Sequence, residues 1–315
     1  MPKFSVIIPL YNKENDIAST LKSLLEQGFD DFEAIVVDDG STDNSKKAVA
    51  NFTDPRIRFF SKENEGVALT RNFGVQKALG AFVAFLDADD NWHPHHLENL
   101  NNLTQQFKDA RWFATAYAKR HHQNFTTPML SPIMKKPKNW TGLVANYFEY
   151  SLTDALAWTS AVCFRKDFFQ ELKGFDPKIT HGAGEDTDLW IRAALASPLA
   201  FSTIISATHN LDGSNRISHT PTLKRNYINV DVYEPYCPEV PFLKKYLDSN
   251  RFSMALQHKM AGDFDSFKRY ASKIDPNNLL LKQRFTLGMP AWFLRLLWKF
   301  KKGMEALNVR LTLFK

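Results

Sequence analysis

The chain has 315 residues, of which 44% are apolar and 13 are glycines, so it can bury a large core and lacks the composition of a disordered protein. Residues 282–315 carry eight Lys or Arg and one Glu, a balance of +7, whereas the first 281 residues carry 32 basic and 33 acidic residues, a balance of −1. A neutral body with a basic tail excludes a nucleic-acid-binding surface spread over the fold. It predicts a local electrostatic task for the tail.

The first third of the chain alternates short apolar runs with amphipathic segments. The predicted strands are residues 4–10, 33–38, 57–61 and 81–86, and the predicted helices are 16–27, a segment from about 44, and 68–79. Helices between strands at this spacing indicate right-handed crossovers and a parallel sheet. Because such sheets bind ligands beyond the carboxyl ends of their strands, the residues that follow the strands are the first candidates for a site. They are Tyr11–Asn12, Asp38–Ser41 and Asp87–Asp90.

Beyond residue 107 the pattern is less regular. Further strands are predicted at 112–118, 158–164 and 199–207, and a helix is predicted at 186–195. From residue 221 onward the chain is predicted to be helical. We expect an α/β region in two halves, 1–110 and 111–220, then a helical extension over 221–284 and a basic amphipathic tail over 285–315.

Three carboxylates, those of Asp87, Asp89 and Asp90, directly follow the predicted strand 81–86. In an extended chain Asp87 and Asp89 point to the same side. Mg²⁺ or Mn²⁺, held by one or two carboxylates and by phosphate oxygens, would neutralise them. The alternative is an acidic turn that caps the following helix. The three carboxylates by themselves leave both interpretations open.

Four motifs in register carry a resemblance to a known family. FSVIIPLYN, IVVDDGSTDNS, NEGVALTRNFG and FLDADDNW follow one another within residues 3–110, and AVCFRKDFFQELKGFD and GEDTDLWIR extend the series. Together they resemble the inverting glycosyltransferases of family two, of the type that builds bacterial cell-surface glycans. The resemblance implies a GT-A fold, that is, a Rossmann-like, mostly parallel sheet flanked by helices, with a donor-binding half (1–110), an acceptor-binding half (111–220) and a helical C-terminal extension.

The resemblance also implies the reaction. A sugar would move with inversion from a nucleotide-diphosphate donor to a hydroxyl of a glycan or lipid-linked acceptor, with Mg²⁺ or Mn²⁺ as cofactor. The implied pathway is lipopolysaccharide, O-antigen or exopolysaccharide synthesis. The implied donor-side residues are Pro9, Tyr11 and Asn12 at the base and ribose end of the nucleotide, Asp39 at the base edge, Asp87 at the ribose hydroxyls and Asp89 at the metal.

Two of the donor-side residues have alternatives. A carboxylate at Asp39 can accept a ring N–H of uracil, thymine or guanine, or it can simply begin the turn before Gly40. Asp38 is then the structural member of the pair. Arg71 resembles an arginine near the nucleotide and could offset diphosphate charge or hold Asp39 or Asp87. The alternative is a surface arginine on an amphipathic helix.

Transfer also needs a base that takes the proton of the acceptor hydroxyl. The segment GEDTDLWIR resembles the Glu-Asp motif of the family, which implies Asp186 as the base and Glu185 as a residue that binds the acceptor or orients the base. Asp188 is four residues before Arg192 and is expected to pair with it. His209 or His219 is a candidate further metal ligand, because some GT-A enzymes take one from this region.

The basic tail 285–315 is predicted to form an amphipathic helix that starts near Pro290. Its apolar face holds Phe293, Leu296, Leu297, Phe300, Met304 and Leu307, and Arg295, Lys299 and Lys302 lie opposite. This pattern is typical of a helix that lies in the plane of an anionic membrane. The alternative is a helix packed on the body or on a second subunit.

The compartment follows from negative features. Cys163 and Cys237 are too few for a disulfide framework, which favours a reducing compartment. No secretory leader is recognisable after Met1, and no stretch reaches the roughly 18 uncharged apolar residues of a membrane span. With the tail, this predicts a cytoplasmic protein on the inner face of the cytoplasmic membrane.

Two other function classes remain at this point. A sugar-nucleotide nucleotidyltransferase should carry a glycine-rich phosphate loop after the first strand, but the segment there, PLYNKEND, has no glycine. A non-catalytic module that binds a nucleotide-sugar or a membrane would have no activity for an Asp186→Asn substitution to remove.

Overall fold

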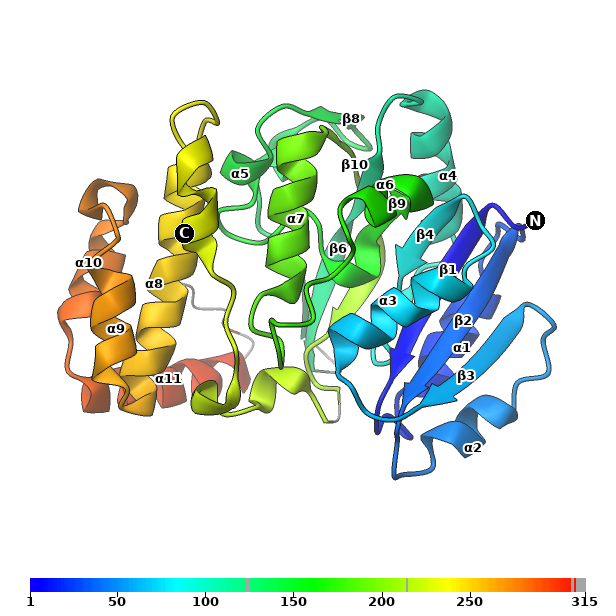
Figure 1. Ribbon diagram of the computed structural model, residues 1–315, viewed down its shortest axis with the longest axis horizontal. Helices are drawn as coiled ribbons and strands as arrows, with labels where there is room; N and C mark the ends of the chain where they lie inside the picture. Colours follow the sequence, from blue (N-terminus) through cyan, green and yellow to red (C-terminus); the bar gives the residue numbers. More distant parts are fainter. Residues whose placement is uncertain (123–124, 214, 307–308, 310–315) are drawn as a thin grey trace. The chain divides into compact units, whose positions relative to one another are not determined.

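The computed structural model describes residues 1–122, 125–213, 215–306 and 309, and the chain divides into two compact units (Figure 1). Unit 1 comprises residues 1–147, 156–219 and 226–228, and unit 2 comprises 148–155, 220–225 and 229–315. The predicted halves 1–110 and 111–220 therefore fall almost wholly within one unit. Their assignment to donor and acceptor stays a prediction.

The N-terminal half of unit 1 is a parallel sheet. Strands β1 (Phe4–Leu10), β2 (Phe32–Asp39), β3 (Ile57–Lys62) and β4 (Phe82–Phe85) stand in the order β3-β2-β1-β4, all parallel. They are connected by α1 (Ile17–Leu25), α2 (Ser45–Ala50) and α3 (Val67–Lys77). Every residue of β2 is buried, as expected for a strand covered on both faces. The predicted parallel sheet is confirmed.

The second half extends the same sheet with mixed pairing. Strand β9 (Val162–Arg165) lies antiparallel between β4 and β6 (Trp112–His122), and β6 runs parallel to β10 (Leu199–Asn210). The short strands β5 (Asn91–Trp92), β7 (Phe125–Pro128) and β8 (Thr141–Val144) pair antiparallel with these. The remaining helices up to residue 224 are α4 (His96–Gln106), α5 (Tyr147–Tyr150), α6 (Lys166–Glu171), α7 (Glu185–Ala196) and the 3-10 turns η1 (Pro132–Lys135), η2 (Thr159–Ala161), η3 (Ile217–His219) and η4 (Thr222–Lys224).

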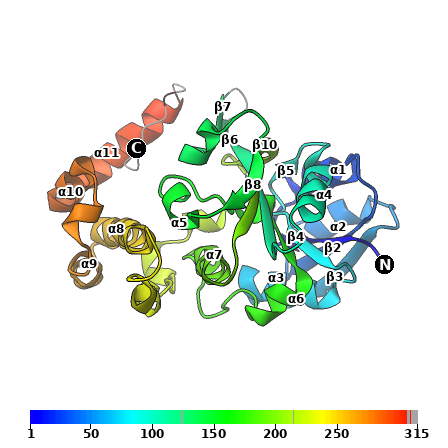
Figure 2. The same cartoon turned by 90° about the horizontal axis from the view of Figure 1, so that it is seen from above.

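Figure 2 shows α1 and α4 on one side of this sheet and α3 and α6 on the other. The predicted α/β architecture is confirmed, but the strand predicted at 158–164 is wrong at its start. Residues 159–161 form the 3-10 turn η2, and the strand begins only at Val162. The turn contains the buried Ser160, and a strand prediction based on runs of apolar residues does not take account of a buried polar residue.

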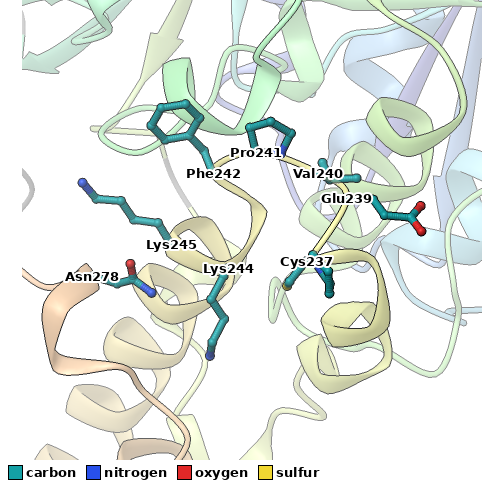
Figure 3. Close-up of a pocket in the computed structure, with 9 residues that line it drawn as sticks. Cys237, Glu239, Val240, Pro241, Phe242, Lys244, Lys245 and Asn278 are labelled. Carbon is teal, nitrogen blue, oxygen red and sulfur yellow. The ribbon is translucent and has the colours of Figure 1, made fainter.

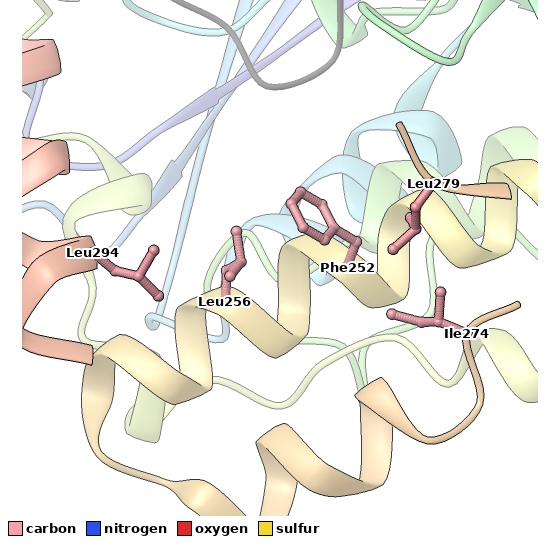
Figure 4. Close-up of a cluster of buried hydrophobic side chains, with 5 residues drawn as sticks. All are labelled: Phe252, Leu256, Ile274, Leu279 and Leu294. Atoms are coloured by element: carbon pink, nitrogen blue, oxygen red, sulfur yellow. The ribbon is translucent and has the colours of Figure 1, made fainter. Parts of the chain in front are cut away.

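Unit 2 is helical, as predicted for the extension. It consists of η5 (Val230–Tyr236), α8 (Leu243–Ala261), α9 (Phe264–Ala271), η6 (Pro276–Asn278), α10 (Leu281–Gly288) and α11 (Ala291–Ala306). Its apolar core joins α8 to the later segments through the buried side chains of Phe252, Leu256, Ile274, Leu279 and Leu294 (Figure 4). In the described part of the chain, every helix is too short or too polar to cross a bilayer.

The two cysteines differ in surroundings. Cys163 is buried in β9, and burial raises the pKa of its thiol above the usual range. Cys237 is half-buried, and burial followed by the charge of Glu234 raises its pKa to about 11. Cys237 lines an open cavity of about 360 Å³ beside Phe242, Lys244 and Lys245 (Figure 3). Both thiols are free.

Candidate active site

The carboxyl ends of the first strands meet at one edge of the sheet, as predicted. Leu10 of β1 lies opposite Asp38 of β2. Beyond β1, Asn12 adopts a φ of 50°; its backbone N–H donates to the Ser41 hydroxyl at 3.0 Å, and its side-chain oxygen accepts the Thr42 N–H at 2.8 Å. These bonds tie the loops after β1 and β2 together.

Tyr11, which precedes Asn12, is 42% exposed, and Pro9 is half-buried. A ligand can therefore reach Tyr11. The predicted role of Pro9, Tyr11 and Asn12 toward a nucleotide stays a prediction.

The adjacent residues Asp38 and Asp39 are both buried and both engaged. Asp38 is fully buried and accepts from the Ser41 N–H and the Ser61 hydroxyl. Asp39 accepts from Lys62 Nζ at 2.5 Å, and from the backbone N–H groups of residues 65 and 66 at 3.0 and 2.9 Å. The Asp39 side chain is 5% exposed. It therefore holds the NEG turn, and a base N–H would be a further donor to it.

Arg71, on α3, holds one of the three carboxylates after β4. Its Nη2 donates to Asp87 Oδ1 at 2.6 Å, and its guanidinium lies 5.2 Å from the centroid of the Phe175 ring. Arg71 is 5% exposed, which excludes the alternative of a surface arginine. Asp87 keeps 28% of its side chain exposed, so a ligand can reach its carboxylate.

Asp89 pairs with a residue that lies outside the sequence motifs. Its Oδ2 accepts from Lys13 Nζ at 2.6 Å, and its side chain is 15% exposed. Burial raises the pKa of Asp89, and the charge of Lys13 opposes that shift. Lys13 follows Tyr11–Asn12 at the same sheet edge, so its position in the sequence could have identified it as a site residue.

Gly213, in the turn after β10, also approaches Asp89. A Cβ on Gly213 would lie 2.8 Å from Asp89 Oδ2 and 3.0 Å from Asp89 Cβ. Only a glycine fits this close approach without moving the carboxylate. The fold brings the two residues together from distant parts of the sequence, and no local pattern signals it.

Asp90 is enclosed rather than exposed. It is 2% exposed, its Oδ2 accepts from the Ser160 hydroxyl at 2.6 Å, and its Oδ1 accepts from the Asn210 N–H at 3.0 Å. Burial, and then the charges of Asp89 and Asp87, raise its pKa well above the usual range. Asp90 therefore ties the segment that follows β4 to η2 and β10. Helix α4 begins after His95 without any side-chain cap, so the alternative of an acidic cap is wrong.

The second acidic segment begins helix α7 and lies close to Arg71. The charges of Asp87, Glu185 and Asp186 all act on the Arg71 guanidinium and raise its pKa against the effect of burial. Asp186 is half-buried, and its Oδ1 accepts from the N–H and the hydroxyl of Thr187 at 2.6 and 3.3 Å. The structure thus brings the proposed base segment to the carboxylates after β4.

Glu185 is the least satisfied acid of this cluster. It is 5% exposed, and within the described residues neither its Oε2 nor the Arg71 Nε has a hydrogen-bond partner. Burial, followed by the charge of Asp186, raises the pKa of Glu185 to about 7, and Arg71 opposes the shift. Glu185 can therefore change its protonation near neutral pH.

Asp188 and His209, two other residues of interest in this region, have structural partners. Asp188 pairs with Arg192 at 2.6 Å, which confirms the expected contact. The ring of His209 stacks on Trp158 at 4.7 Å, and its Nε2 lies 3.2 Å from Arg216 Nη2. His219 is exposed in η3. A metal-ligand role for His209 or His219 stays a prediction.

Residues 5–171 match the family described as Glycosyl transferase family 2. The chain belongs to this family. An uncharacterized glycosyltransferase of Rickettsia conorii is 38% identical over 123 residues, which cover 39% of this chain and 20% of the relative. The Escherichia coli protein WfgD, named UDP-Glc:alpha-D-GlcNAc-diphosphoundecaprenol beta-1,3-glucosyltransferase, is 41% identical over 95 residues, which cover 30% of this chain and 38% of WfgD. The similarity thus spans less than half the length of these relatives.

The fold of this family 2 protein is similar to that of S. aureus TarS 1-349, solved in complex with UDP-GlcNAc. The TM-score is 0.58 at 16% sequence identity, and the match covers 86% of this chain and 90% of the TarS chain. At this identity the likeness shows the fold alone. It agrees with the GT-A architecture that the motifs implied.

The donor set at the sheet edge of this family 2 protein fits a hard divalent cation. Within the described residues, no three His, Cys, Asp or Glu side chains gather in a group that could hold a metal ion. Mg²⁺, however, is commonly held by one or two carboxylates together with substrate phosphates. Asp87 and Asp89 supply such carboxylates: after burial, the charge of Asp87 is one of the influences that raise the pKa of Asp89, and both side chains keep some exposure. A metal at Asp89 stays a prediction.

Proposed function

We propose that this family 2 protein is a glycosyltransferase that moves a sugar from a nucleotide-diphosphate donor to an acceptor hydroxyl with inversion. The observation that carries the proposal is the convergence of two acidic segments on Arg71: Asp87 bonds to its guanidinium, and Glu185 and Asp186 act on it through their charges. The first segment follows a strand at the ligand-binding edge of the sheet. The second can supply a base from another direction.

Asp186 is proposed as the base. It takes the proton of the acceptor hydroxyl while the hydroxyl oxygen bonds to the anomeric carbon. The bond between that carbon and the phosphate oxygen breaks, and its electron pair leaves with the nucleotide diphosphate. Because the acceptor enters opposite the leaving group, the anomeric configuration inverts. Glu185, buried beside Asp186, is proposed to bind the acceptor or orient the base.

The donor is proposed to lie along the carboxyl ends of β1, β2 and β4. The residues proposed to contact the base and ribose are Pro9, Tyr11, Asn12, Asp39 and Asp87. Asp89 is proposed to bind the metal, with His209 or His219 as a further ligand. A bound Mg²⁺ or Mn²⁺ would stabilise the charge that develops on the leaving diphosphate. The ammonium of Lys13, 2.6 Å from Asp89, is a positive charge of the protein itself beside the proposed metal ligand.

The proposed pathway is the synthesis of a cell-surface glycan such as lipopolysaccharide, O-antigen or an exopolysaccharide. The name of WfgD specifies a UDP-Glc donor and a diphosphoundecaprenol-linked acceptor, and TarS was solved with UDP-GlcNAc. These names support a nucleotide-sugar donor and a glycan or lipid-linked acceptor for this chain. The proposed place of the reaction is the inner face of the cytoplasmic membrane.

A thermal-shift panel of nucleoside diphosphates, each with and without Mn²⁺, tests the proposal. We expect at least one nucleotide to raise Tm, and to raise it further with Mn²⁺, because ligands that bind only the folded state stabilise it. If no nucleotide raises Tm with or without metal, the proposal is wrong. For the nucleotide that binds, NMR of the product formed from its sugar conjugate reports the anomeric configuration, and a retained configuration would contradict inversion.

A further inference from the structure

Helix α11 buries one apolar residue and exposes others. Leu294 is 4% exposed and packs into the unit 2 core beside Leu256 of α8 (Figure 4). Trp292, Leu296 and Phe300 are 66%, 56% and 58% exposed. The sequence pattern did not place Leu294 on the apolar face of the helix. One side of the helix therefore packs within unit 2, and the alternative of packing on the catalytic body or on a second subunit stays a prediction.

Three of the exposed apolar residues of α11 form a stripe, and Leu297 and Trp298, which are 39% and 49% exposed, lie outside it. Trp292, Leu296 and Phe300 are spaced by four residues, so they stand one above another along one side of the helix; we refer to them as the α11 stripe. Leu294 lies about a third of a turn or more away from each residue of the stripe at 3.6 residues per turn. Burial of Leu294 therefore holds the helix on unit 2 with the α11 stripe turned outward.

We propose that the α11 stripe docks unit 2 on an anionic lipid bilayer. Exposed Lys299 lies beside the stripe, and residues 282–315 carry eight Lys or Arg against one Glu. Cations near an apolar helix face attract the negative surface of such a membrane, and tryptophan is enriched at the membrane–water interface. A bilayer has an apolar interior that can bury the α11 stripe and a negative surface that attracts the basic residues.

A second copy of the chain fits the same surface poorly. In a two-fold dimer the same patch faces itself, so the exposed Lys299 side chains of both copies would be brought together. Repulsion between like charges opposes that arrangement. The charge pattern thus favours an anionic bilayer over self-association.

Helix α9 of the same unit provides a matched comparison. It exposes Phe264 (50%) and Lys268, an aromatic residue and a lysine like those of α11, but the residue four positions after Phe264 in α9 is Lys268 itself and not an apolar residue. A single exposed apolar residue is ordinary for a protein surface. Substitutions on α9 therefore control for the loss of one exposed ring or one positive charge.

The test is cosedimentation of the full chain with vesicles of phosphatidylcholine alone or mixed with phosphatidylglycerol, without donor or acceptor. We expect binding to the mixed vesicles, weaker binding as salt is raised, and little binding to phosphatidylcholine. The double substitution Leu296→Ser, Phe300→Ser should weaken binding by at least about tenfold, and Lys299→Glu by roughly fivefold or more. Phe264→Ser and Lys268→Glu should bind like the unmodified chain.

The proposal is overturned if the double variant, with an unchanged Tm, binds the mixed vesicles as well as the unmodified chain. It is also overturned if the unmodified chain does not bind them at all. Light scattering that shows a dimer, converted to a monomer by the double substitution, with no vesicle binding, would instead identify the stripe as a self-association surface. None of these measurements depends on sugar transfer, so they fail or succeed independently of the proposed reaction.

Discussion

The segments 87–90 and 185–188 each hold three carboxylates within four positions, but the carboxylates of the two segments have different kinds of partner. In the first segment every carboxylate bonds to a residue from elsewhere in unit 1, including the cations Arg71 and Lys13. In the second, the acids either bond within the helix, as Asp188 does to Arg192, or retain an unpartnered oxygen, as Glu185 does within the described residues.

The difference shows that the partners of an acid, rather than its spacing, indicate its task. The charge of Lys13 favours the ionised form of Asp89 against the effect of burial. Asp90 of the same segment is enclosed by Ser160 and Asn210, and its pKa is raised well above the usual range. Glu185 has an oxygen without a partner within the described residues, and burial raises its pKa to about 7. We therefore assign ligand binding to Asp87 and Asp89, which keep some exposure, and proton exchange to the segment 185–188.

The strongest challenge to this division is Asp186→Asn. We expect the transfer rate to fall by about 10²- to 10⁴-fold, the usual contribution of a general base, while the thermal shift caused by the donor nucleotide is retained. Asp188→Asn is the matched variant: loss of its ion pair with Arg192 should lower Tm but leave the rate per folded molecule unchanged. Equal rates for Asp186→Asn and the unmodified chain would remove Asp186 from the reaction.

The two acids that end the first segment give the next comparison. Asp89→Asn should lower transfer by about 10²- to 10³-fold, the range observed when one group that stabilises transition-state charge is removed, and should remove any additional shift in Tm due to Mn²⁺. Asp90→Asn should mainly lower Tm, because Asp90 is enclosed by Ser160 and Asn210. The division fails if Asp90→Asn abolishes the Mn²⁺ effect and Asp89→Asn does not.

A smaller effect is expected from Gly213→Ala. The added Cβ would stand 2.8 Å from Asp89 Oδ2, so the carboxylate must move. Misplacement of a functional group by about 1 Å can cost up to about 10²-fold in rate, so we expect a loss below that of Asp89→Asn. Nucleotide titrations with and without Mn²⁺ should show the change only in the presence of metal. Gly288→Ala, on a glycine with no neighbour within 4 Å of a Cβ and without a positive φ, is a control for the metal effect.

The smallest effect concerns stability and Glu185. Its pKa in the folded protein is about 7, raised from an ordinary value of 4.5 by burial. The folded state therefore favours the protonated acid, and this stabilisation is complete below pH 4.5 and lost as the pH rises through 7. Relative to Glu185→Gln, the unmodified chain should lose a few degrees of Tm between pH 5 and pH 8. Parallel Tm curves for the two proteins would contradict the raised pKa.

Much of unit 1 could be predicted because its signals are local. The apolar run at 4–10 coincides with β1, and the residues after β1, β2 and β4 do meet at one edge. The partners that give these residues their roles come from afar: Ser160 and Asn210 reach Asp90 across 70 and 120 positions. No periodicity encodes such contacts. The side of α11 that packs on unit 2 was missed for the same reason, since its partner Leu256 lies on another helix.

The contrast between the two thiols has a practical consequence. Cys163 is sealed inside the sheet of unit 1, whereas Cys237 borders an open cavity in unit 2. A thiol-reactive dye should therefore modify Cys237 alone in the folded protein, without any engineered cysteine. Because the pKa of Cys237 is about 11 and the thiolate is the reactive species, the reaction should speed up as the pH is raised. The chain thus carries a built-in labelling position in the unit whose bilayer contact is to be measured.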